Sequence, residues 1–99
     1  MRLFFAVALL LSAALPAHAT VFCGIAPTPD GFVALRAGPS ASARLLARMR
    51  VGDEVMIGLD RAGPWVAVRW WPGDSRLVRG FHTGRRGWVH GALLDEVCG

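Results

Sequence analysis

The sequence predicts a small all-β barrel. Short apolar segments alternate with turns rich in Gly and Pro, a pattern typical of antiparallel barrels and sandwiches. Residues 65–71 alternate with a period of two, which places Val66, Val68 and Trp70 on one face of a half-buried strand. No internal repeat or low-complexity tract indicates a different architecture.

Residues 1–19 are predicted to be a secretory signal peptide. Arg2 gives the segment a positive start, an apolar run follows at 3–15, and Ala17-His18-Ala19 is a typical cleavage site. The run is shorter than the roughly 20 residues that a membrane-spanning helix needs. We therefore expect no transmembrane anchor after cleavage. Residues 20–99 are expected to form one domain that is periplasmic or secreted.

The first half of the domain is predicted to begin with a turn and a strand. Pro and Gly at residues 27–31 predict a turn, and residues 32–36 follow it as the first strand. Residues 42–50 are ambiguous, because Leu45, Leu46 and Met49 also fit helical spacing.

The second half is predicted to contain antiparallel strands connected by two turns. Turns are expected at 60–64 and 72–75, on either side of the strand at 65–71. A return strand is expected at 76–82, and a closing hairpin begins at 83–84.

Two phrases in this order resemble the bacterial SH3-like domain called SH3b. They are Leu35-Arg36-Ala37-Gly38-Pro39-Ser40, a strand followed by a turn, and Thr83-Gly84-Arg85-Arg86-Gly87-Trp88-Val89, the closing Gly-x-x-Gly-Trp-Val hairpin.

The resemblance implies an SH3-like barrel of about five strands. It favours a strand over a helix at 45–49, before a Gly52-Asp53 turn and a strand at 54–59. It also implies that residues 92–94 form a one-turn 3₁₀ helix and the start of a final strand.

The chain departs from the family at residues 69–82, which lengthen the gap between the two phrases by about one hairpin. This extended hairpin is either an exposed arm of Trp and Arg that contacts a partner, or a cap in which Trp70 and Phe81 cover the core. On the first interpretation, Trp71, Arg79 and Arg85 are candidate ligand-binding residues.

The resemblance also points to a groove beside the loop that follows Arg36. Trp65 matches a position that often lines the ligand groove in SH3-like folds, and its ring suits stacking on a peptide or glycan. Trp88 is expected to pack structurally. Arg36 is expected to brace the loop, with ligand binding as its other possible role.

Cys23 and Cys98 are predicted to form a disulfide. They are the only two cysteines, and an exported chain folds in an oxidising compartment. The bond would close nearly the whole domain and stabilise a small core. A catalytic pair of one cysteine with His82 or His90 is the alternative.

The chain carries a net positive charge, because its 11 basic residues, all of them Arg, outnumber its seven acidic residues. A basic face suits an anionic envelope polymer or an acidic partner, although a solvated hairpin gives the same pattern. Nucleic acid is not expected as a partner of an exported protein. His82, His90 and Asp95 do not have the spacing of a zinc site, so neither a metal nor a cofactor is predicted.

The sequence thus predicts an exported, non-catalytic binding module. No nucleophile elbow, phosphate-binding loop or dinucleotide fingerprint is present. The resemblance implies peptidoglycan or another cell-envelope component as the ligand. The alternative from a different class is a periplasmic protein–protein adaptor or inhibitor that uses the extra hairpin.

Overall fold

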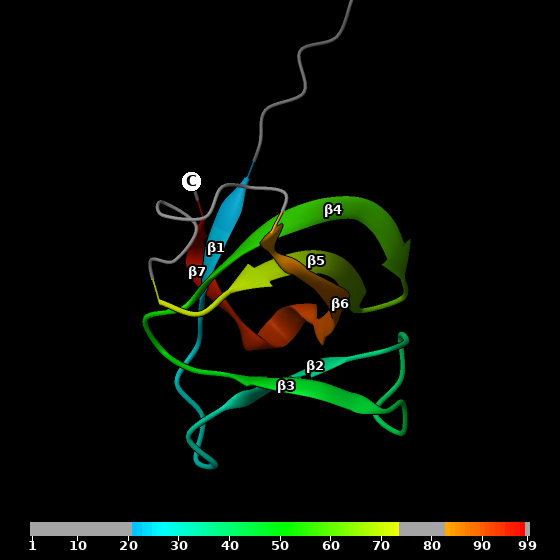
Figure 1. Ribbon diagram of the computed structural model, residues 1–99, viewed down its shortest axis with the longest axis horizontal. Coiled ribbons are helices and arrows are strands. Elements are labelled where there is room, and N and C mark those ends of the chain that lie inside the picture. Colours follow the sequence, from blue (N-terminus) through cyan, green and yellow to red (C-terminus); the bar gives the residue numbers. More distant parts are fainter. Residues whose placement is uncertain (1–20, 74–82, 99) are drawn as a thin grey trace, which may run out of the picture.

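The fold is a single curled antiparallel sheet. The computed structural model describes residues 21–73 and 83–98 (Figure 1), which form seven strands in the order β3-β2-β6-β5-β4-β1-β7. In chain order these are β1 (Phe22–Ile25), β2 (Val33–Arg36), β3 (Leu45–Met49), β4 (Glu54–Ala62), β5 (Trp65–Trp71), β6 (Arg85–His90) and β7 (Leu94–Cys98). The predicted all-β, SH3-like class is confirmed.

Strand β1 is not among the strands predicted from the sequence, the first of which is at residues 32–36. Its burial alternates along Phe22–Ile25, with Cys23 and Ile25 in the core, and it pairs with both β4 and β7. The segment has the alternation of a strand, but it is short and directly follows the predicted leader.

The ambiguous segment forms a strand, β3, as the family resemblance predicted. Its residues pair with β2 from Val33↔Met49 to Arg36↔Leu45. Met49 is 0 % exposed and Leu45 lies outside the core at 37 %. The helical spacing of the leucines is therefore overridden by the pairing with β2, as is common for short segments.

Glycines with positive φ mark four of the expected turns, at Gly31, Gly52, Gly63 and Gly73. Gly31 has φ +81° and donates its N–H to the Thr28 carbonyl at 3.0 Å, and Gly52 has φ +102° before Asp53. The turn expected at 60–64 is shorter than predicted. β4 runs to Ala62, which pairs with Trp65 across a tight turn at Gly63.

The second phrase, residues 83–89, mostly forms strand rather than turn. Residues 85–90 are β6, and neither Gly84 nor Gly87 has a positive φ. These glycines instead allow close packing. A Cβ on Gly84 would lie 2.6 Å from the Trp71 ring, and one on Gly87 would lie 2.7 Å from Leu35 Cγ. Strand β6 thus forms the second half of the predicted closing hairpin.

The core lies inside the curl of the sheet. Val66 and Val68 are buried and Trp70 packs against their cluster, so the predicted inner face of β5 is confirmed. The other buried members of this cluster are Cys23, Ile25, Val33, Leu35, Met49, Val55 and Val89.

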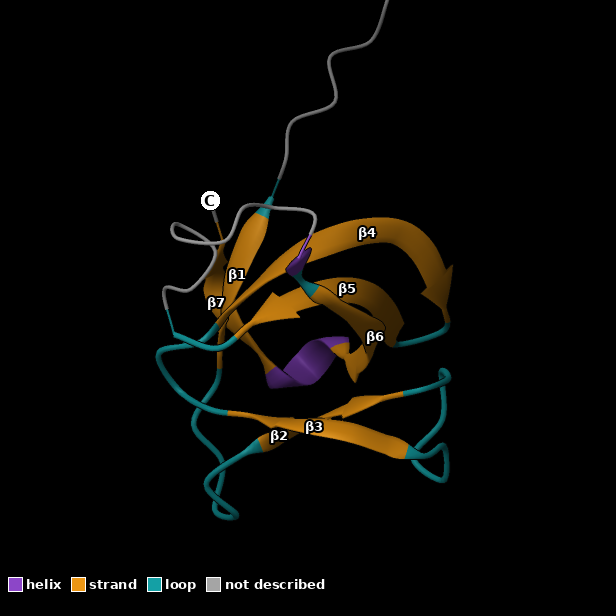
Figure 2. Cartoon of the chain, in the orientation of Figure 1, coloured by secondary structure: helices purple, strands orange, loops and turns teal. Residues whose placement is uncertain are grey.

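The chain ends as the resemblance implied. A one-turn 3₁₀ helix, η3, occupies Gly91–Leu93 between β6 and β7 (Figure 2). Cys23 and Cys98 are opposite each other on β1 and β7, and their sulfurs are bonded at 2.09 Å. The predicted disulfide is thus present, and it joins an edge strand to its neighbour.

Some of the sequence predictions concern residues outside the described ranges. The signal peptide at 1–19, the return strand at 76–82 and the side chain of Arg79 belong to this group. Within the described residues, no helix has the length and apolar character needed to cross a membrane.

Candidate binding groove

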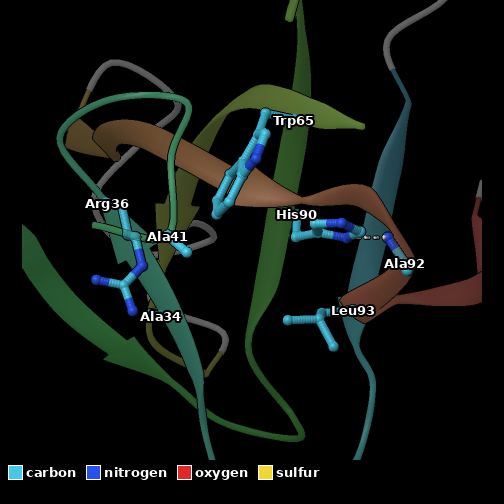
Figure 3. A pocket seen from close by; sticks show the side chains of 7 residues that line it. All are labelled: Ala34, Arg36, Ala41, Trp65, His90, Ala92 and Leu93. Atoms are coloured by element: carbon cyan, nitrogen blue, oxygen red, sulfur yellow. Dashed lines mark hydrogen bonds between the residues drawn. The ribbon is translucent and has the colours of Figure 1, made fainter. Parts of the chain in front are cut away.

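A groove of about 360 Å³ lies where the loop after β2 faces η3. It is lined by Ala34, Arg36, Ala41, Trp65, His90, Ala92 and Leu93. Figure 3 shows Arg36 and Ala41 on one side of it, His90 and Leu93 on the other, and the Trp65 ring between the two sides.

The register of the sheet explains why residues far apart in the chain meet here. Trp65 on β5 is opposite His90 on β6, and Arg36 on β2 is opposite Trp88 on β6. Since side chains of directly paired residues share a face, these four side chains form two adjacent rows on the outer face of the sheet. The groove follows these rows.

The ring of Trp65 is held edge-on by a second aromatic ring. The Trp65 and His90 ring centroids are 5.4 Å apart with an interplanar angle of 75°. His90 Nδ1 accepts a hydrogen bond from the Ala92 N–H at 3.2 Å and so caps η3. This bond makes Nε2–H the donor of the neutral imidazole. The cap therefore orients both rings toward the groove.

Arg36 braces the loop, as expected, and also lines the groove. One of its terminal nitrogens, Nη1, donates to the Ala43 carbonyl at 2.9 Å, which ties β2 to the loop that carries Ala41. Its other N–H groups make no hydrogen bond or ion pair within the described residues. The guanidinium thus combines a structural contact with unused donors.

The polar groups of the groove are donors. Arg36 has spare N–H groups, His90 contributes Nε2–H, and the Trp65 indole N–H has no partner within the described residues. The remaining described lining side chains are Ala and Leu, and none of the lining residues is acidic. Such a surface suits a ligand that presents a flat apolar face together with carbonyl, hydroxyl or carboxylate oxygens.

The other predicted site residues do not line this groove. Arg85 is exposed at the start of β6, opposite Trp70, and Arg79 lies outside the described residues. Trp88 is half-buried in the row beside Trp65 and His90, and it occupies the middle of the sheet.

Trp71 does not offer the exposed surface that the sequence reading proposed. It is 1 % exposed, and its ring lies 6.5 Å from that of Phe22. Its indole N–H donates to the Thr83 hydroxyl at 3.3 Å, and Gly84 lies directly against the ring. The outer face of β5 is therefore covered at this end and open at Trp65, which a period-two pattern alone does not distinguish.

The sequence reading missed His90 and Leu93 as groove residues. Alternation along β6 from Trp88 would have placed His90 on the same face. Leu93 comes to the groove through the fold of η3, and it is 37 % exposed there. No local signal in the sequence indicates that contact.

The comparison with known families agrees with this geometry. A family model described as the bacterial SH3 domain matches residues 31–95. The chain belongs to the bacterial SH3 domain family. No curated protein and no solved structure matches the chain.

The bacterial SH3 domain of this chain includes β2 to η3 and so contains every described residue of the groove. Domains of this family are typically binding modules and are often associated with cell walls. Strand β1 and both cysteines lie outside the matched residues. The disulfide therefore joins two segments of this chain that the family model does not cover.

Proposed function

We propose that this bacterial SH3 domain is an exported, non-catalytic module that binds a peptide or glycan segment of peptidoglycan in the groove beside Trp65. One observation carries the proposal. The ring of Trp65 lies beside N–H donors of Arg36 and His90 that have no partner within the described residues, in a groove whose described lining has no acidic side chain.

The chemistry of the polymer fits this surface. Sugar rings and peptide planes present flat faces that stack on an indole, and their hydroxyl, carbonyl and carboxylate oxygens accept hydrogen bonds. A guanidinium in addition favours the carboxylates of peptidoglycan stem peptides. These contacts suit recognition of a linear polymer by a shallow groove.

Two features support export. The pattern of residues 1–19 is that of a signal peptide. The bond between Cys23 and Cys98 favours a compartment in which disulfides persist. Export would place the groove in the same compartment as peptidoglycan.

The proposal is tested by co-sedimentation of the oxidised protein with purified peptidoglycan. We expect the wild type to sediment and Trp65→Ala to lose most of the bound fraction, since removing a stacking ring costs about 1–3 kcal/mol in other aromatic sites. Val51→Ala is the matched control, because Val51 is 65 % exposed and does not line the groove.

Two results would overturn this function. One is a wild type that stays in the supernatant, and the other is a Trp65→Ala variant that binds as well as Val51→Ala. Capture of one envelope protein in place of the polymer, with the same dependence on Trp65, would identify the domain as an adaptor instead.

A further inference from the structure

A second hollow lies on the outer face of β4, β5 and β6. It consists of two adjoining depressions, of about 140 and 210 Å³, which share Asp60, Ala67, Val68 and Arg86. We call these four residues and the space above them the β4–β6 hollow. Leu59 and Arg69 border it on one side, and Ala37 and Trp88 on the other.

The hollow exists because β4 bulges where it crosses β5. Ile57 pairs with Val68 and Arg61 with Val66, so residues 58, 59 and 60 of β4 all lie opposite the single residue Ala67. A Cβ on Gly58 would lie 3.0 Å from the Ala67 carbonyl oxygen, so glycine permits this close crossing. Small side chains on both strands leave the space open.

The bulge also changes the directions in which the side chains of β4 point. Leu59 is 90 % exposed, whereas Asp60 lines both depressions of the hollow. Bulges commonly redirect side chains in this way beside functional sites. The carboxylate of Asp60 is thus brought to a space bordered by two arginines.

The charges in the hollow are opposite but do not pair with each other. Asp60 and Arg86 line the same space, yet neither makes a hydrogen bond or ion pair within the described residues. Arg69 is directly opposite Arg86 in the β5–β6 ladder and donates to the Gly84 carbonyl at 3.3 Å. Within the described residues, the guanidinium of Arg86 is thus the positive group of the hollow that is open to a negative group of a ligand.

The hollow and the groove lie on the same face of the β5–β6 ladder. The pairs Trp65↔His90, Ala67↔Trp88 and Arg69↔Arg86 follow one another at intervals of two residues. At about 3.3 Å per residue, the arginine row lies about 13 Å from the Trp65 row. A single extended ligand can therefore contact Trp65 and reach the hollow across Trp88.

We propose that the β4–β6 hollow binds a zwitterionic amino-acid head, meaning an ammonium and a carboxylate on one carbon, of the ligand that stacks on Trp65. The carboxylate binds Arg86, and the ammonium binds Asp60. This inference rests on the proposed function and narrows it to a polymer whose peptides carry such a head.

A zwitterion fits the hollow better than an ion of one sign. A simple anion would satisfy Arg86 but would approach the carboxylate of Asp60, and a simple cation would satisfy Asp60 but would approach the guanidinium of Arg86. A head with both charges satisfies each side without repulsion.

The test uses three forms of one synthetic peptide whose last side chain ends in the amino-acid head. One form keeps the head free, the second has its amine acetylated, and the third has its carboxylate amidated. Binding is measured by calorimetry with the oxidised wild type, Asp60→Asn, Arg86→Gln and the control Arg61→Gln. Arg61 is the neighbour of Asp60 in the chain but borders a different depression, next to Val66.

We expect the wild type and Arg61→Gln to bind the free head about fivefold more tightly than either blocked form, the range of an exposed charge pair. Asp60→Asn should lose only the preference for a free amine, and Arg86→Gln only the preference for a free carboxylate. This crossed pattern would show which side chain contacts which end of the head.

Three results would overturn the inference without touching the proposed function, provided that binding to peptidoglycan still depends on Trp65. They are no binding of the free peptide, equal binding of all three forms, and sensitivity to amidation alone, which would indicate a simple anion site. Loss of the Trp65 dependence itself would overturn the proposed function instead.

Discussion

Gly87 on β6 lies directly against Leu35 on β2, with no room for a side chain between them. A Cβ at residue 87 would come within 2.7 Å of Leu35 Cγ and 3.0 Å of the Arg36 carbonyl oxygen. This contact lies beside Arg36↔Trp88, the one registered pair between β2 and β6. Gly87 therefore allows the junction that brings Arg36 to the same groove as Trp65.

Gly87→Ala is expected to destabilise the domain by about 1–3 kcal/mol, because overpacking must displace Leu35 or the β2 backbone. Urea unfolding of the oxidised protein measures this loss. Gly24→Ala is the matched control, since its Cβ would meet only Asp95 at an ordinary 3.5 Å. Equal stability of the two variants would contradict the packing argument.

The disulfide between Cys23 and Cys98 is expected to supply a large part of the stability. It closes a loop with a sequence separation of 75 residues, for which the chain-entropy model gives about 4.5 kcal/mol. Urea unfolding with and without a reductant should show that loss. The double variant Cys23→Ala, Cys98→Ala should unfold near the reduced wild type, and a midpoint equal to that of the oxidised protein would refute the expectation.

Asp53 links the β3–β4 turn to the end of β5. Its carboxylate accepts hydrogen bonds from the Arg50 N–H at 2.9 Å, the Trp70 indole N–H at 3.0 Å and the Gly73 N–H at 2.7 Å. A side chain that satisfies three donors at once fixes the geometry of both segments.

Asp53→Ala is expected to cost about 2 kcal/mol, because it removes three hydrogen bonds and leaves the partly buried Trp70 indole N–H without its partner. A double-mutant cycle with Trp70→Phe isolates the indole bond, and we expect a coupling of about 1 kcal/mol. Asp30→Ala, at an exposed turn, serves as the control. Additive effects of the two changes would show that the indole bond contributes nothing.

Truncation of Trp71 is expected to reduce mainly the stability of the domain, and truncation of Trp65 mainly its ligand binding. Trp71→Ala removes a ring that is 1 % exposed and should destabilise the domain by about 3–5 kcal/mol. Trp65→Ala should reduce ligand binding with a much smaller effect on the unfolding midpoint, because the ring is only half-buried. A stability loss of the same size in both variants would make Trp65 a packing residue.

Much of the fold was predictable because its signals are local. Period-two alternation marked β5 and its inner face, and the Pro and Gly residues at 27–31 marked the turn in which Gly31 has a positive φ. The strand at β3 required the family resemblance, since its leucines also fit a helix. β1 escaped prediction because four residues beside a predicted leader carry little pattern.

The candidate groove was predictable only in part. Trp65 and Arg36 were named from the two phrases, and the structure places both in the groove. Trp71 was predicted to be exposed because it lies in the extra segment at 69–82, and the length of a segment does not show which side chains cover it. Phe22, Thr83 and Gly84 cover that ring from other parts of the chain.

The class of the domain, the disulfide pair and the strand–turn phrases could be predicted from the residues alone, because turn chemistry and strand alternation act between near neighbours. The packing role of the glycines in the second phrase, and the place of Asp60 and Arg86 in one hollow, follow from the folded sheet. Both depend on the register between β2, β4, β5 and β6. That register results from contacts between strands distant in the chain, which a local pattern does not contain.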